Sequence, residues 1–296
     1  MYEGYFADPF VLRRGDRYYA YGTGVPSPGD VFDSLSSPDL TSWTPEGRCL
    51  RRLDDAAGDE YWAPEVAYSD GAYWMYYSVG RGISGHHIRV ARSDEPTGPF
   101  EDQGVNLTPH EMFAIDPHPF QDVDGTWYLY YARDVLTDPR PGTQLAVDRF
   151  GGMTALMGNP AVVLAPNADW QIYARNRAMY GDVYEWHTME GPTVVRRHGR
   201  YWLTYSGGSW EGHGYGVSWG VAPHPLGPWE HAPTNAPRLL ETTPELVGPG
   251  HSSITTAPGG RDVLVFHAWD NAMTGRRMHL RYIEFTPDRP AVGGPL

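Results

Sequence analysis

One short sequence pattern occurs five times along the chain and constrains the fold more than any other feature. Each copy has an ionisable residue near its start, then a mostly apolar run, a polar turn that contains glycine, and a run rich in aromatic or β-branched residues. The copies span residues 8–21, 64–77, 116–131, 189–206 and 251–266. Two such runs around a polar turn are typical of a β-hairpin. The sequence therefore predicts five hairpins that each carry an ionisable residue where they begin.

The spacing of the copies predicts how the hairpins are assembled. The glycines of the five turns are Gly15, Gly71, Gly125, Gly199 and Gly260, which puts successive copies 54 to 74 residues apart. Further strand-like segments follow the hairpins. Repeats of roughly 40 to 50 residues with several short strands are typical of a β-propeller, and longer intervals indicate loop insertions. We expect an all-β chain, a five-bladed β-propeller with about four antiparallel strands per blade, folded as a single domain over residues 1–296.

The composition agrees with this fold class and excludes some partners. The chain has 11 Trp and 20 Tyr, which favour strands, and 35 Gly and 27 Pro, which favour frequent turns, so we expect little helix. The formal net charge of −13 opposes binding to nucleic acid or to an anionic membrane surface, because both would repel the chain. A neutral small-molecule substrate stays open.

The cysteine content and the first residues bear on localisation. Cys49 is the only cysteine, so no intrachain disulfide can form. Met1 is followed by Tyr2-Glu3-Gly4-Tyr5, without a basic segment, an apolar segment or a transmembrane run. We expect a cytoplasmic protein and leave open a secretion signal removed beforehand. The oligomeric state cannot be inferred.

A long insertion separates the third hairpin from the fourth. Residues 153–187 read as a loop with one short helix, and they include Trp170, Tyr173 and Tyr180. Loops of this length are usually functional. We expect this one to overhang a site.

The ionisable residues that open the hairpins predict a site. In a propeller the innermost strand of each blade lines the axis, so equivalent residues converge. We place Asp8, Glu65, Asp116, Glu190 and His251 at these positions. An Asp before Pro is a common turn residue, and each acid taken singly has that simpler interpretation. Recurrence favours function, because two carboxylates on either side of a glycosidic bond are what sugar hydrolysis needs.

His251 has two interpretations. It fits a buried histidine of the core, and it fits a ligand of a metal ion near the axis. No partner at close sequence spacing completes a zinc site, and calcium prefers oxygen ligands.

Five motifs together resemble glycoside hydrolase family 43. They are Ala7-Asp8-Pro9-Phe10, Trp62-Ala63-Pro64-Glu65, Ile115-Asp116-Pro117, Glu190-Gly191-Pro192 and Gly250-His251-Ser252. The resemblance implies a five-bladed propeller enzyme that inverts the anomeric centre. It implies the general base at Asp8, the general acid at Glu190, and at Asp116 a residue that orients the acid and raises its pKa.

The resemblance also implies residues around these three. Trp62 walls the sugar pocket. An arginine that contacts the sugar falls at Arg276, with Arg277 as the adjacent alternative. His251 lies below the site, where many members of the family bind a calcium ion, so Ca²⁺ near His251 is the one cofactor that we consider. No organic cofactor is expected.

Among the family's activities the 153–187 insertion favours a closed pocket. We expect an exo-acting β-xylosidase with α-L-arabinofuranosidase side activity on xylo- or arabino-oligosaccharides. The alternatives are an endo- or exo-acting arabinanase and a non-catalytic carbohydrate-binding propeller. The retaining fructan-cleaving propellers fit less well, because they place their nucleophile in an Asn-Asp-Pro setting and Ala7 precedes Asp8 here.

Overall fold

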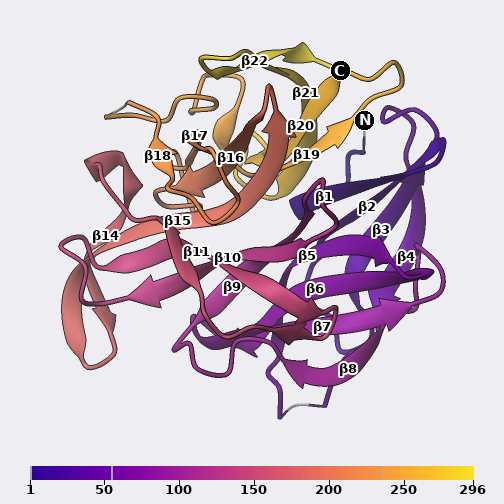
Figure 1. Cartoon of the computed structure of the whole chain (residues 1–296), viewed down its shortest axis with the longest axis horizontal. Coiled ribbons are helices and arrows are strands. Elements are labelled where there is room, and N and C mark those ends of the chain that lie inside the picture. The colour runs from indigo at the N-terminus through magenta and orange to yellow at the C-terminus, as the bar shows by residue number, and fades with distance from the viewer. Residues whose placement is uncertain (1, 55, 234) are drawn as a thin grey trace.

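A computed structural model describes residues 2–54, 56–233 and 235–296 of the chain. Within these ranges it has strands β1 to β22 and one three-residue 3-10 helix, η1 (Figure 1). The all-β class is therefore confirmed. The described residues include no helix that is long and apolar enough to cross a membrane. Cys49 is buried and has no disulfide.

Three antiparallel sheets each contain four strands in chain order. The first sheet consists of β1 (Ala7–Arg14), β2 (Arg17–Thr23), β3 (Val31–Ser37) and β4 (Thr44–Leu50). The second consists of β5 (Glu60–Ser69), β6 (Ala72–Arg81), β7 (Ser84–Ser93) and β8 (Glu101–Asn106). The last consists of β19 (Val247–Thr256), β20 (Asp262–Trp269), β21 (Arg276–Phe285) and β22 (Pro290–Pro295).

The middle of the chain forms one ten-stranded sheet with two halves. The first half is β9 (Ala114–Gln121), β10 (Trp127–Val135), β11 (Gly142–Gly152), β12 (Ala155–Leu156) and β13 (Ala161–Leu164). The second is β14 (Ile172–Met179), β15 (Asp182–Arg197), β16 (Arg200–Gly207), β17 (Gly216–Ala222) and β18 (Glu230–His231). The halves meet where Gly142 and Thr143 pair in parallel with His187 and Thr188. A Cβ atom on Gly142 would lie 1.9 Å from the carbonyl oxygen of His187, so this junction requires glycine.

The insertion between the third and fourth hairpins is more ordered than expected. It contains the short helix η1 (Asp169–Gln171), but most of it is strand, and β14 pairs with the first part of β15 as an antiparallel hairpin. We refer to residues 172–187 as the β14–β15 hairpin; it lies at the left of Figure 1.

Five hydrophobic clusters join the strand groups in a cycle. They lie between the first and second sheets, between the second sheet and β9–β11, between β9–β13 and β15–β16, between β16–β17 and the last sheet, and between the last sheet and the first. In the last of these clusters Val11 and Leu35 pack with Val263 and Leu280. The opening strands β1, β5, β9, β15 and β19 likewise contact one another in cyclic order. The two ends of the chain therefore meet, as the indigo and yellow strands do in Figure 1.

Each of the five opening strands has an irregularity at which one residue takes a left-handed backbone conformation. These residues are Asp8 (φ 49°), Ala63 (50°), Asp116 (58°), Gly191 (57°) and His251 (47°). The pairing register shifts at the same points, as at a β-bulge. Our expectation that Glu65 and Glu190 are equivalent to Asp8 is therefore wrong in register. Ala63 and Gly191 hold those positions.

Candidate active site

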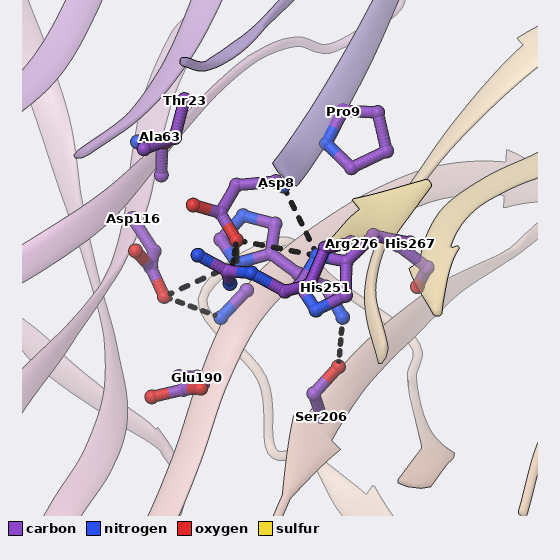
Figure 2. A network of polar contacts seen from close by, with 12 residues as sticks. Asp8, Pro9, Thr23, Ala63, Asp116, Glu190, Ser206, His251, His267 and Arg276 are labelled. Carbon is purple, nitrogen blue, oxygen red and sulfur yellow. Dashed lines mark hydrogen bonds and ion pairs between the residues drawn. The ribbon is translucent and has the colours of Figure 1, made fainter. Parts of the chain in front are cut away.

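One cavity of about 810 Å³ contains the three carboxylates that the sequence predicts to act together. Asp8, Asp116 and Glu190 all line it, and so does His251. They come from β1, β9, β15 and β19, four of the opening strands that contact one another in the cycle. Figure 2 shows their side chains gathered at one point. The irregularity in each strand turns side chains toward this cavity, as bulges beside active sites commonly do.

A repeated contact holds four of the left-handed residues in place. Their backbone N–H groups donate to a side chain of the hairpin that precedes them in the cycle. In that hairpin the accepting residue pairs with the residue just before the hairpin's own bulge. The four pairs are Ala63 with Thr23 Oγ1 (2.9 Å), Asp116 with Ser78 Oγ (3.0 Å), His251 with Ser206 Oγ (2.7 Å) and Asp8 with His267 Nδ1 (3.0 Å). Buried amides need such partners, so this contact fixes the opening strands relative to each other.

The fifth position differs. The corresponding residue of β10 is Ala132, which pairs with Ile115 and has no side-chain acceptor. The backbone N–H of Gly191 instead donates to Oδ2 of Asp116 at 2.9 Å. Because Gly191 follows Glu190 directly, this hydrogen bond ties the carboxylate of Asp116 to the backbone that carries Glu190.

Asp8 lies in a cationic and imidazole-rich environment. Its Oδ1 is 3.2 Å from Nη1 of Arg276, 3.3 Å from Nδ1 of His267 and 3.5 Å from Nδ1 of His251. Burial alone would raise the pKa of Asp8, but the charge of Arg276 and the two imidazoles outweigh burial and hold this pKa well below its usual value. Asp8 is therefore ionised at neutral pH.

His267 is the neutral partner in this group. Burial is the main cause that lowers the pKa of His267, to about 4. Its Nδ1 accepts the backbone N–H of Asp8, as expected for an uncharged ring.

The pKa of Glu190 is shifted in the opposite direction to that of Asp8. Burial raises its pKa to about 7; the hydrogen bond from Tyr215 Oη to Oε1 (2.6 Å) works against that rise, and the negative charge of Asp8 adds to it. The pKa of Asp116 is raised well above its usual value by burial and then by the charges of Glu190 and Asp8. We expected the charge of Asp116 to act on Glu190. Asp116 is itself hard to ionise, so the negative charge that raises the pKa of Glu190 is that of Asp8.

The other predicted residues are found as follows. Trp62 lines the cavity, donates from Nε1 to Oε2 of Glu60 (3.2 Å), and stacks on His86 with 3.6 Å between ring centroids. Arg276 also lines the cavity. Arg277 does not line the cavity and pairs with Asp270 at 3.1 Å. The contact of Arg276 with a sugar stays a prediction.

Glu65 does not join the three carboxylates at the cavity. It is buried, and its Oε2 lies 2.7 Å from Nδ1 of His118, while Nε2 of His118 accepts the backbone N–H of Val194. This arrangement links β5, β9 and β15 and gives Glu65 a structural environment.

His251 does not have the surroundings of a calcium ligand. Its Nδ1 faces Asp8 Oδ1 at 3.5 Å and Asp116 Oδ2 at 3.8 Å. In the described part of the chain, no three His, Cys, Asp or Glu side chains are placed to hold a metal ion. The side chains present thus do not form the oxygen-rich set that calcium prefers, and most ligands would have to be water. Calcium at this position stays a prediction.

The insertion contributes to the cavity in part. Tyr173 and Arg177 line it. Trp170 instead packs on Tyr205, and Tyr180 donates to Oδ2 of Asp134 at 2.7 Å. The expectation that this segment borders the site holds for the β14–β15 hairpin.

Sequence reasoning missed several residues of the site. Tyr5, Trp210 and Tyr215 come from irregular segments and lack a motif. The sequence does contain a pattern that points to His267. Thr23, Ser78, Ser206 and His267 each follow the aromatic run of a hairpin. Aligning these runs would have identified His267, and Ala132 as the exception.

Comparison with known proteins places the chain in a family. The model of the glycosyl hydrolases family 43 matches residues 1–289. The chain is 29% identical to the β-D-galactofuranosidase xynD of Aspergillus niger, over 90% of this chain and 75% of that protein. It is 24% identical to an extracellular exo-α-(1→5)-L-arabinofuranosidase of Streptomyces avermitilis, over 88% of this chain, which spans only 54% of that protein.

A solved structure agrees over nearly the whole chain. It is that of an endo-1,4-β-xylanase from Bacteroides thetaiotaomicron, with 31% sequence identity and a TM-score of 0.81, covering 98% of this chain and 94% of that one. The protein is a member of the glycosyl hydrolases family 43.

Proposed function

We propose that this glycoside hydrolase inverts the anomeric centre, with Asp8 as general base, Glu190 as general acid and Asp116 as the residue that positions the acid. One observation carries the proposal: the two carboxylates line the same cavity while their surroundings move their pKa values apart, well below the usual value for Asp8 and to about 7 for Glu190. A base that is ionised and an acid that stays protonated at near-neutral pH are what glycoside hydrolysis requires.

The proposed step is a single displacement. Asp8 removes a proton from a water molecule whose oxygen bonds to the anomeric carbon. The glycosidic C–O bond breaks as this bond forms, and Glu190 gives its proton to the departing oxygen. The charge of Arg276 keeps Asp8 ionised for its role, while burial keeps Glu190 protonated. The hydrogen bond from Gly191 to Asp116 fixes the backbone beside Glu190.

We further propose that the fold is a five-bladed propeller forming one catalytic domain over residues 1–296. The blades would be the three four-stranded sheets and the two halves of the ten-stranded sheet. The cyclic contacts of the opening strands and the five clusters between successive groups support this interpretation. The parallel junction at Gly142 would then be a local link between two blades.

For the substrate we propose a neutral oligosaccharide from which a terminal pentose is removed, by β-xylosidase activity with α-L-arabinofuranosidase activity beside it. Trp62 offers an aromatic wall, and Arg276 offers hydrogen-bond donors next to Asp8. The relatives named above act, by their names, on galactofuranosides, arabinofuranosides and xylan. A β-D-galactofuranoside therefore belongs among the substrates to be tested.

An arabinanase is the second candidate, and the size of the cavity favours it. The cavity of about 810 Å³ also reaches residues 24–28 and the turn at Ile83. This volume is near the upper end for ligand pockets and leaves room beyond one pentose ring.

Two measurements test the proposal. Rates on 4-nitrophenyl β-D-xyloside, α-L-arabinofuranoside and β-D-galactofuranoside, beside linear arabinan, identify the substrate. NMR of the first-formed sugar then identifies the stereochemistry, and we expect the anomer opposite to that of the substrate. Retention of configuration would overturn the roles of Asp8 and Glu190, and activity on arabinan alone would replace the exo-acting β-xylosidase by the second candidate.

A further inference from the structure

Arg177 differs from the other arginines of the cavity. Arg48, Arg52 and Arg276 each donate to a carbonyl or carboxylate oxygen of the protein. Arg177 lines the same cavity, yet it forms no hydrogen bond or ion pair with a residue in the described ranges. A guanidinium has five N–H donors, so those of Arg177 remain available to a ligand.

Two aromatic rings hold Arg177 in its place. The guanidinium carbon lies 4.6 Å from the ring centre of Tyr173 and 5.0 Å from that of Trp186. Trp186 is fully buried and is part of β15, which pairs with β14. Stacking on aromatic faces fixes the guanidinium and leaves its edge free for hydrogen bonds. The guanidinium of Arg177 is thus held in place while its N–H groups have no hydrogen-bond acceptor among the described residues.

Arg177 lies on the side of the acid. It belongs to β14, which pairs with the first part of β15, the strand that carries Glu190. The charges of Arg276 and Arg177 both lower the pKa of Glu190, but Arg276 donates to Asp8 and Arg177 does not. The cation in contact with Asp8 is Arg276, whose Nη1 lies 3.2 Å from Oδ1 of Asp8. Since the acid protonates the oxygen of the departing group, side chains beside Glu190 and away from Asp8 face that group.

We propose that Arg177, fixed by Tyr173, binds the sugar that leaves, and that it does so by donating to a pair of hydroxyl groups. This inference rests on the proposed function, because it takes Glu190 as the acid. The ligand is neutral rather than acidic, because the carboxylates of Asp134 and Glu211 border this end of the cavity. Arg177 acts on the pKa of Asp134, and Glu211 acts on that of Tyr173. Arg177 therefore makes the enzyme prefer an oligosaccharide to a glycoside without a second sugar.

The test compares leaving groups in Arg177→Ala and Arg177→Lys. The control is Arg175→Ala on the same strand, because Arg175 is exposed, pairs with Glu185 at 2.6 Å and does not line this cavity. At pH 5.5, below the pKa of Glu190, kcat/KM on a neutral disaccharide should fall about tenfold or more in Arg177→Ala, the loss expected for one or two hydrogen bonds. On the 4-nitrophenyl glycoside of the same sugar it should stay within about threefold. Arg177→Lys should recover part of the loss, and Arg175→Ala should match the wild type.

A binding measurement separates failure of this inference from failure of the proposed function. Calorimetry of the disaccharide with Glu190→Gln protein, with and without Arg177→Ala, needs no turnover, and we expect Kd to rise about tenfold. Equal losses on both leaving groups, an unchanged Kd, or a loss confined to oligosaccharides that carry a uronic acid would each overturn the inference. Retained configuration at the anomeric carbon would overturn the proposed function and leave this binding result standing.

Discussion

The backbone N–H of Gly191 donates to Oδ2 of Asp116 at 2.9 Å because the hairpin that precedes it in the cycle has an alanine, Ala132, where the other four have an acceptor. The missing side chain at Ala132 thus helps to place a carboxylate of the site. The same residue makes that relationship testable without altering any group that lines the cavity.

A hydroxyl at position 132 should compete for this hydrogen bond. In Ala132→Ser the new oxygen can accept the N–H of Gly191, as Ser206 accepts that of His251. Asp116 then loses the donor that favours its ionised form and its orientation. We expect kcat to fall about tenfold, the effect of losing one hydrogen bond, with KM little changed. Ala132→Gly adds no acceptor and should keep kcat despite lower stability. Full activity of Ala132→Ser would contradict the role given to this hydrogen bond.

The phenol of Tyr215 should shift the alkaline limit of activity to lower pH. Glu190 must be protonated to act as acid, so the rate should fall as the pH rises through about 7. The hydrogen bond from Tyr215 lowers the pKa of Glu190 against burial. In Tyr215→Phe the alkaline limb of the kcat/KM profile should therefore move up by roughly 0.5 to 1 pH unit. A limb that stays in place, or moves down, would show that Tyr215 does not act on the acid.

Ionising Glu190 should destabilise the fold. Its folded pKa of about 7 exceeds that of an unfolded chain, about 4.3, so the folded state binds the proton more tightly. This contribution is complete below the unfolded pKa and is lost as the pH rises through about 7. Glu190→Gln cannot ionise and should lose less stability than the wild type between pH 5 and 8, by roughly 2 kcal/mol in urea unfolding. Parallel curves for the two proteins would argue against a raised pKa.

Removal of divalent cations should leave the rate unchanged. His251 is surrounded by Asp8 and Asp116 without a third ligand side chain in the described part of the chain, so any ion would be held mostly through water. We expect kcat/KM after dialysis against a chelator to stay within about twofold of the untreated enzyme, because the side chains around His251 do not supply the set of oxygen ligands that calcium prefers. A loss that calcium restores and magnesium does not, and that His251→Ala abolishes, would establish the calcium site.

The sequence predicted the repeat and most of the site, and its errors have a physical cause. The recurring hairpins identified Asp8, Asp116 and Glu190 because each lies at or beside an irregularity of an opening strand. The predicted register is wrong at Glu65 because we aligned the acidic residues of the hairpins with one another. The position of the bulge is instead marked by the residue that precedes proline. Asp8, Ala63, Asp116 and Gly191 all precede proline.

Other parts of the site could not be predicted in this way. Tyr215 and Arg177 reach the cavity from segments outside the repeat, so only tertiary structure brings them to Glu190. The parallel junction at Gly142 depends on how far β15 extends beyond its own hairpin, which local sequence does not determine.

The central claim is that Glu190 is the acid and Asp8 the base, and leaving-group dependence tests it most directly. Rates of Glu190→Ala and Asp8→Ala should be compared on a dinitrophenyl glycoside, whose leaving group needs little protonation, and on an alkyl glycoside. Glu190→Ala should retain most activity on the first and lose about 10² to 10⁴-fold on the second, while Asp8→Ala should lose activity on both. Equal losses on both substrates in Glu190→Ala would contradict the account.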